Sequence, residues 1–144
     1  MKIGIIRYPG SNCDYDTLKY FDNSFFIWHK ETILPDNIDL LVIPGGFAFG
    51  DRIYNKATEN YSISPGEMAI KSPVTKLIFE AVEKGILILG ICNGFQILIH
   101  LGLLPGKLIL NDCEKFICKE KKYNYNYNKI TGSTDLYVAN SYGK

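Results

Sequence analysis

Residues 86–102 read Ile-Leu-Ile-Leu-Gly-Ile-Cys-Asn-Gly-Phe-Gln-Ile-Leu-Ile-His-Leu-Gly, and this stretch decides the fold. Its first six residues are all apolar or glycine, which is typical of a short strand buried on both faces of a sheet. The large apolar residues that follow recur at helical spacing: Phe95, Ile97, Leu98 and Leu101. The pattern therefore predicts a strand at 86–91 that turns directly into a helix, with Cys92 at the bend.

A cysteine between two glycines on such a bend is typical of a nucleophile elbow, with sulfur in place of oxygen. Gly90 and Gly94 fit this interpretation, because a tight strand-to-helix turn leaves no room for a β-carbon beside the nucleophile. The N-terminus of the helix would also stabilise the thiolate, which is the reactive form of cysteine. The alternative is a buried structural cysteine. The flanking glycines and the switch from strand to helix favour a nucleophile at Cys92.

The rest of the N-terminal part alternates strands with helices. Further strands are predicted at 2–8, 24–29 and 39–44. Asp14 or Asp16 is expected to cap a short helix that follows the first strand. Ser72-Pro73 is expected to begin another, with Ser72 as the cap, that ends at Gly85. This alternation predicts an α/β fold with a mostly parallel sheet flanked by helices.

In parallel sheets of this kind, the functional loops follow the carboxyl ends of the strands. Gly10–Asp14, Gly45–Asp51 and Cys92 should therefore meet at one edge of the sheet. Beyond residue 106 the pattern changes, and 108–110 and 115–119 are predicted to be short antiparallel strands around a turn at 111–112. The Tyr-Asn repeat at 123–128 is compatible with a further strand, although asparagine is a poor strand residue.

Length and composition exclude several classes of protein. At 144 residues, with 47% hydrophobic and 22% charged residues, the chain has the size and composition of one globular domain. A net charge of +1 gives no indication of a nucleic-acid partner, and no apolar run is long enough to cross a membrane. None of the four cysteines forms a C-x-x-C pair, so no metal site is expected. Reduced thiols point to a cytoplasmic protein.

A thiolate that attacks a carbonyl needs an oxyanion hole and a grip on its substrate. The backbone N–H groups of Gly46 or Phe47, together with that of Asn93, are the candidates for the hole. Gly45 beside them permits a close approach of backbone to ligand. Gln96 lies one helical turn after Cys92, where it could reach a substrate amide.

A general base is harder to find, because the chain has only two histidines. His29 ends the second predicted strand, and His100 lies roughly 12 Å from Cys92 along the axis of its helix. Neither fits a hydrogen bond to the sulfur. The sequence thus predicts a nucleophile without an evident base.

Several motifs together resemble one family. They are Tyr-Pro-Gly-Ser-Asn-Cys-Asp at 8–14, Ile-Pro-Gly-Gly-Phe-Ala-Phe-Gly-Asp at 43–51, Gly-Ile-Cys-Asn-Gly-Phe-Gln-Ile-Leu at 90–98, Gly-Leu-Leu-Pro-Gly at 102–106, and 108–118 with its Lys-Phe-Ile-Cys. In this order they are similar to the glutamine amidotransferase subunits of phosphoribosylformylglycinamidine synthase, over residues 1 to about 120. The resemblance implies a flavodoxin-like, class I glutamine amidotransferase-like fold.

The resemblance also implies a chemistry. Cys92 would attack the side-chain amide of glutamine, form a thioester and release ammonia to a large synthetase subunit. A small bridging subunit is a possible further partner. That synthetase would use ATP and magnesium to make formylglycinamidine ribonucleotide in purine synthesis, so no cofactor is expected in this chain. Gly46, Phe47 and Asn93 would build the oxyanion site, and Gln96 would help to hold glutamine.

The chain departs from the family pattern near its end. The family carries its catalytic His and Glu in a Pro-His-Pro-Glu stretch that has no counterpart here, and Asn140 and Tyr142 stand where a His and a Glu are usual in an earlier segment. We therefore expect residues 1–144 to form a single, incomplete domain with little glutaminase activity of its own. Two alternatives stay open: a truncated or regulatory subunit that keeps only the fold and its docking surface, and a cysteine hydrolase with the same elbow.

Overall fold

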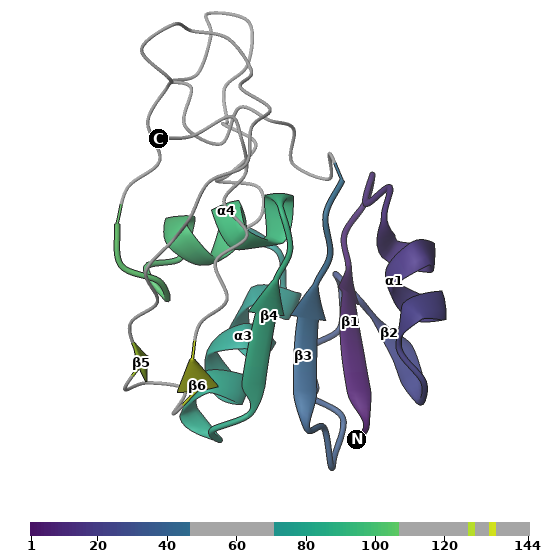
Figure 1. The fold of residues 1–144 in the computed structure, drawn as a ribbon, viewed down its shortest axis with the longest axis horizontal. Coiled ribbons are helices and arrows are strands. Elements are labelled where there is room, and N and C mark those ends of the chain that lie inside the picture. The colour runs from purple at the N-terminus through teal and green to yellow at the C-terminus, as the bar shows by residue number, and fades with distance from the viewer. Residues whose placement is uncertain (47–70, 107–126, 129–132, 135–144) are drawn as a thin grey trace, which may run out of the picture.

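The computed structural model describes residues 1–46 and 71–106, and the backbone of 127–128 and 133–134. Its centre is a four-stranded sheet in the order β2-β1-β3-β4, in which every neighbouring pair is parallel (Figure 1). The elements of this part are β1 (Ile3–Arg7), α1 (Asp14–Tyr20), β2 (Ser24–Trp28), β3 (Leu40–Ile43), α3 (Val74–Glu83), β4 (Leu87–Gly90) and α4 (Asn93–His100). The predicted α/β fold with a mostly parallel sheet is confirmed. Each of the four predicted strands ends within one residue of the observed one.

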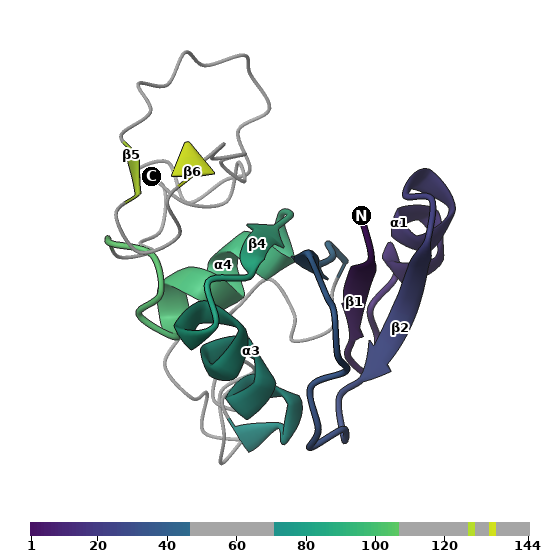
Figure 2. The same ribbon diagram turned by 90° about the horizontal axis from the view of Figure 1, so that it is seen from below.

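Helices cover both faces of the sheet. Side chains alternate between the faces along a strand, so neighbouring residues of β1 enter different cores. On one face Ile6 joins a cluster with α3 and α4, and on the other Ile5 packs near residues of α1. Figure 2 shows α1 beside β1 and β2, and α3 and α4 near β4.

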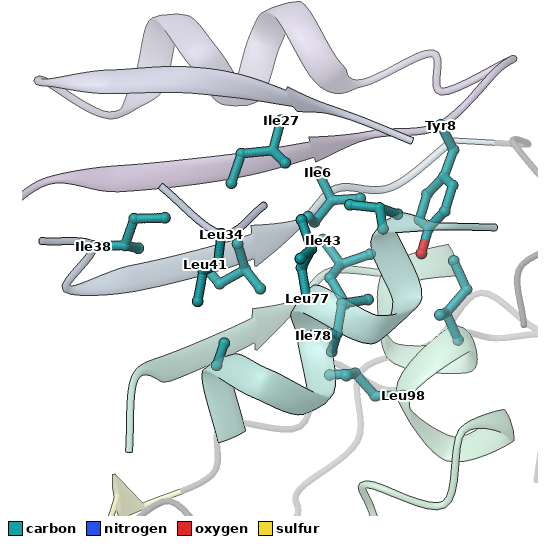
Figure 3. Packing of buried hydrophobic residues seen from close by; sticks show 13 residues of the cluster. Ile6, Tyr8, Ile27, Leu34, Ile38, Leu41, Ile43, Leu77, Ile78 and Leu98 are labelled. Carbon is teal, nitrogen blue, oxygen red and sulfur yellow. The ribbon is translucent and has the colours of Figure 1, made fainter. Parts of the chain in front are cut away.

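The larger core lies between the sheet and the helices α3 and α4 (Figure 3). Its fully buried members are contributed by strands and helices alike: Ile6, Ile27, Leu41, Ile43, Val74, Leu77, Ile78, Ala81 and Ile97. Tyr8 closes this core at the end of β1. Burial raises the pKa of its phenol to about 12, although a hydrogen bond with the Thr75 side chain acts in the opposite direction. Tyr8 is therefore a neutral core residue at physiological pH.

The starts of two helices differ from the prediction. Neither Asp14 nor Asp16 is the N-cap residue of α1, because Cys13 takes that position and makes no side-chain capping hydrogen bond. The Asp14 carboxylate, one residue later, accepts from the backbone N–H of Tyr15 through one oxygen and from Arg7 through the other. Ser72 does not cap α3 either, since that helix begins one residue later with Pro73 at its N-cap.

Ser72 has a different partner from the one expected. Its hydroxyl donates to the backbone carbonyl of His29 over 2.8 Å, and the N–H of Val74 donates to the same carbonyl over 3.1 Å. The start of α3 is thus tied to the end of β2. Of the three side chains predicted as possible caps, Asp14 and Ser72 join separate elements, which the local sequence does not reveal.

The prediction that the strand at 86–91 is buried on both faces is wrong for β4. Leu87 is exposed, and Ile88, Leu89 and Gly90 are only half-buried. Within the described sheet β4 is the last strand, so it lacks the second neighbour that β1 and β3 have. The apolar sequence of β4 is typical of a central strand. Its place at the end of the described sheet, rather than its sequence, accounts for its partial exposure.

The C-terminal predictions are only partly described. The strands predicted at 108–110 and 115–119 lie outside the described residues. Two residues of the Tyr-Asn repeat form β5 (Tyr127–Asn128), which pairs antiparallel with β6 (Ser133–Thr134). A short antiparallel C-terminal element is therefore present. That 1–144 form a single domain stays a prediction. No helix in the described ranges is long and apolar enough to span a bilayer.

Leu77→Ala should destabilise the chain strongly. Leu77 is 1% exposed in the larger core, and truncation of such a side chain leaves a cavity that costs about 2–5 kcal/mol of unfolding free energy. Phe79→Ala, at a position of the same helix that is 40% exposed, is the matched control and should cost far less. Urea unfolding of both variants measures the difference, and equal losses would contradict the assigned core face of α3.

His29 should make the fold weaker in mild acid. Burial lowers the pKa of its imidazole from the ordinary value of 6.5, and the nearby Lys30 charge lowers it further. The unfolded chain therefore takes up a proton before the folded chain does, so this contribution to stability is present above pH 6.5 and is lost as the pH falls. Unfolding free energies measured between pH 7.5 and about 5.5 should fall less for His29→Gln than for the parent. Parallel curves would show that His29 is not coupled to folding.

Candidate functional site

Cys92 lies at the bend between β4 and α4, where the sequence places a nucleophile. It is the N-cap residue of α4 and is half-buried. Its backbone has φ 54° and ψ −106°, a conformation that residues with a β-carbon seldom adopt. Such strain persists only where the surrounding structure enforces it, and it concentrates at functional sites. The geometry is that of a nucleophile elbow.

The two flanking glycines are required by close contacts. A β-carbon on Gly94 would collide with the backbone carbonyl oxygen of Ile43 in β3. A β-carbon on Gly90 would lie 2.6 Å from a methyl carbon of Leu98 and 2.9 Å from the Gly94 carbonyl. The turn is closed by hydrogen bonds from the N–H of Ile91 to Ile43 and from the N–H of Gly94 to Ile91. Glycine at both positions therefore lets α4 start directly against the sheet.

The loop after β3 runs beside the elbow. A β-carbon on Gly45 would lie 3.3 Å from the Cys92 β-carbon, so these two residues are in direct contact. Gly46 has φ +121°, and a β-carbon there would lie 2.5 Å from the backbone nitrogen of Asn12. The loops after β1, β3 and β4 thus meet at one edge of the sheet. The expected convergence is confirmed as far as the described residues reach, and Phe47 and the rest of 47–51 lie outside them.

Asn93 and Gln96 are both buried, at 1% exposure each. The amide nitrogen of Asn93 donates to the amide oxygen of Gln96 over 3.0 Å, and the backbone N–H of Gln96 donates to the carbonyl of Cys92. Gln96 therefore braces the first turn of α4 from within. Its contact with a substrate stays a prediction, as does the oxyanion role of Gly46 and Asn93. As the first residue of the helix, Asn93 has a backbone N–H without an intrahelical acceptor.

The two histidines lie apart from Cys92. His29 follows β2, three strands away from β4, which corresponds to about 14 Å across the sheet. His100 ends α4, at the opposite end of the helix from Cys92. Within 1–46 and 71–106, no three His, Cys, Asp or Glu side chains gather closely enough to hold a metal ion. The absence of a metal from the whole chain stays a prediction.

An ion pair fixes the start of α1. Arg7 Nε lies 2.6 Å from a carboxylate oxygen of Asp14, whose side chain is buried. The guanidinium also packs over the rings of Tyr15, Phe26 and Trp28, at 4.9–5.8 Å from their centroids. Cation–π contacts and a charged partner together favour one position for Arg7. The end of β1 and the first turn of α1 are thereby held together.

Cys13 lies closer to the elbow than its sequence position indicates, although residues 10–14 were expected at the same edge of the sheet. Its sulfur lies 3.9 Å from the point where a β-carbon on Gly45 would stand, and the Cys92 β-carbon lies 3.3 Å from that same point. Cys13 is exposed. The spacing of the two cysteines, 79 positions apart in the chain, gives no sign that they approach each other. The only available signal was that both follow predicted strands of one parallel sheet.

Comparison with known proteins gives a consistent result. A family model described as a CobB/CobQ-like glutamine amidotransferase domain matches residues 1–131. The chain is 42% identical over 123 residues to the phosphoribosylformylglycinamidine synthase subunit PurQ of Cereibacter sphaeroides. It is 43% identical over 135 residues to the subunit of the same name from Pseudothermotoga lettingae. These matches cover 83% and 90% of this chain, but 51% and 53% of the relatives. The chain thus spans about half of their length.

A solved structure agrees with the sequence comparisons. A chain in the structure of PurLQS from Thermotoga maritima is 37% identical and superposes with a TM-score of 0.65. The match covers 82% of this chain and 52% of that one. The two chains are therefore similar in sequence as well as in fold.

Gly94→Ala should destabilise the chain, although alanine in place of glycine within a helix usually stabilises it by about 0.5–1 kcal/mol. The added methyl would meet the carbonyl of Ile43, so α4 must move, at a cost of about 3 kcal/mol or more. Gly85→Ala is the control, because open space surrounds it and only its φ of +71° costs about 1–2 kcal/mol. Thermal unfolding compares the two. A Gly94→Ala protein as stable as the parent would contradict the contact with β3.

Proposed function

Because the chain belongs to the family of CobB/CobQ-like glutamine amidotransferase domains, we propose that it provides the glutaminase part of a phosphoribosylformylglycinamidine synthase in purine synthesis. The observation that carries the proposal is Cys92, held in a strained backbone conformation at the N-terminus of α4. The relatives named above are subunits of that synthase.

The chemistry follows from the elbow. The Cys92 thiolate attacks the side-chain amide carbon of glutamine, and the carbonyl oxygen becomes an oxyanion. Backbone N–H groups of Asn93 and of Gly46 or Phe47 are the proposed donors to that oxyanion. Collapse of this intermediate breaks the C–N bond, and the nitrogen leaves as ammonia once it gains a proton. A water molecule then hydrolyses the thioester, which gives glutamate and restores the thiol.

A thiol nucleophile needs a proton acceptor, for which histidine is the usual side chain. His29 and His100 are both too far from Cys92 for a hydrogen bond. We therefore propose that a base other than these two histidines completes the site. Until that base is in place, turnover should be weak, because most thiols are protonated at neutral pH.

The proposed partner is a large synthetase subunit, which would receive the ammonia and use ATP and magnesium. The likeness to a chain of PurLQS supports an assembly of several subunits. A small bridging subunit belongs to the same proposal. We place the activity in the cytoplasm, where thiols stay reduced. The alternative of a regulatory subunit that catalyses no reaction is not favoured, because the similar curated proteins are PurQ subunits of the synthase.

Labelling with an electrophilic glutamine analogue, such as a diazoketone, tests the site directly. We expect the analogue to modify Cys92, as read by the mass of its tryptic peptide, and an excess of glutamine to protect it. His100→Gln should leave the labelling unchanged, because this side chain lies at the far end of α4. Modification of Cys92 by iodoacetamide but not by the analogue would show a reactive thiol without a glutamine site.

Cys92→Ala tests the reaction itself. With the synthetase partner and any completing segment present, the variant should lose roughly 10⁴-fold or more of its glutamate production, as expected when a covalent nucleophile is removed. Ammonia supplied in solution should restore the synthetase step, because only its delivery has been lost. Full glutamine-dependent activity in the variant would refute the assignment of Cys92.

A further inference from the structure

Two cysteines from separate loops approach each other across a glycine. Cys13 follows β1 and Cys92 follows β4, while Gly45 follows β3, which lies between these two strands in the sheet. The Cys13 sulfur and the Cys92 β-carbon lie 3.9 Å and 3.3 Å from the point where a Gly45 side chain would begin. Both cysteines therefore lie within 4 Å of one point beside Gly45, and this glycine has no side chain to occupy that point.

The backbone does not explain glycine at this position. The φ of Gly45 lies outside the left-handed range, unlike that of Gly46, so other residues could adopt its conformation. A β-carbon at Gly45 would lie 3.3 Å from the Cys92 β-carbon, 3.4 Å from the Ile91 carbonyl oxygen and 3.9 Å from the Cys13 sulfur. A side chain here would therefore crowd the elbow and enter the space beside both cysteines.

Both cysteines are attached to well-held backbone. The carbonyl of Cys13 accepts hydrogen bonds from the N–H and the hydroxyl of Thr17, and Asp14 beside it is paired with Arg7. Cys92 is fixed by the elbow. Cys13 is exposed, so a small oxidant can reach this part of the sheet edge. A disulfide between the two residues requires their side chains to meet by rotation while both loops stay in place.

We propose that Cys13 is a resolving cysteine, which forms a reversible disulfide with Cys92 under peroxide. The Cys92 thiolate attacks one oxygen of hydrogen peroxide, which yields a sulfenic acid and hydroxide. The Cys13 thiolate then attacks the sulfenic sulfur, so that an S–S bond forms and a second hydroxide leaves. In total two thiols are oxidised, one peroxide is reduced and two waters are produced.

The disulfide stops the proposed glutaminase reaction and protects Cys92 from irreversible oxidation, and a dithiol reductant reverses it. The inference rests on the proposed function for its biological meaning, but not for its chemistry.

Peptide mapping of the full chain tests the proposal. The protein is treated with hydrogen peroxide, remaining thiols are blocked with N-ethylmaleimide, and the chain is cleaved with trypsin without reductant. We expect peptides 8–19 and 85–107 to be joined, with a combined mass lower by two hydrogens and released by dithiothreitol. Cys13→Ser should lose this cross-link, and Cys92 should instead advance to sulfinic and sulfonic acid. Cys13→Ala repeats the test if the serine variant fails to fold, as judged by circular dichroism.

The double variant Cys113→Ser, Cys118→Ser is the control and should keep the cross-link, which excludes a pairing with either of these residues. A cross-link from Cys92 to Cys113 or Cys118, or equal over-oxidation of Cys92 in the parent and in Cys13→Ser, would overturn the proposal. Because the readout is a mass, it is independent of glutamine turnover. A cross-link without labelling by the glutamine analogue would reject the proposed function alone, and labelling without a cross-link would reject this inference alone.

Discussion

The first turn of α4 packs directly against the backbone of β3, and the site depends on this contact. The carbonyl oxygen of Ile43 occupies the place where a side chain at Gly94 would begin. That proximity allows no gradual transition from strand to helix, so the chain must turn at one residue, and Cys92 takes the strained conformation that results. The buried hydrogen bond between the side-chain amides of Asn93 and Gln96 also supports this turn. The packing of α4 against β3, rather than any preference of cysteine for this backbone conformation, places Cys92 at the bend.

The order of the strands brings the remaining parts of the site together. Since β3 lies between β1 and β4, its loop is flanked by the loops of both neighbours. The contact of Gly46 with Asn12 closes one side of this arrangement, and the contact of Gly45 with Cys92 closes the other. Three segments that are far apart in the sequence thus form one surface through parallel pairing alone. The ion pair between Arg7 and Asp14 keeps the first of these loops in place.

Much of this was predictable because it depends on short-range patterns. Apolar runs gave the four strands to within one residue, and the glycines around Cys92 gave the elbow. The predictions were wrong where burial or hydrogen bonding depends on residues far apart in the sequence. The exposure of β4 follows from its place at the end of the described sheet, and Ser72 bonds to His29 rather than to its own helix. Parallel pairing predicted that the loop of Cys13 shares a sheet edge with Cys92, but not that Cys13 itself lies beside the elbow, because that depends on the order of the strands and on a glycine in a third loop.

The backbone conformation of Cys92 has a consequence for evolution and for engineering. A glycine there would adopt φ 54° without the penalty of about 1–2 kcal/mol that a β-carbon brings, so the most stable sequence for this turn is not the one that carries the proposed nucleophile. Selection for thermostability alone would therefore favour loss of that cysteine. If Cys92 acts as proposed, stability and activity oppose each other at this one residue, and the neighbouring packing offsets the cost.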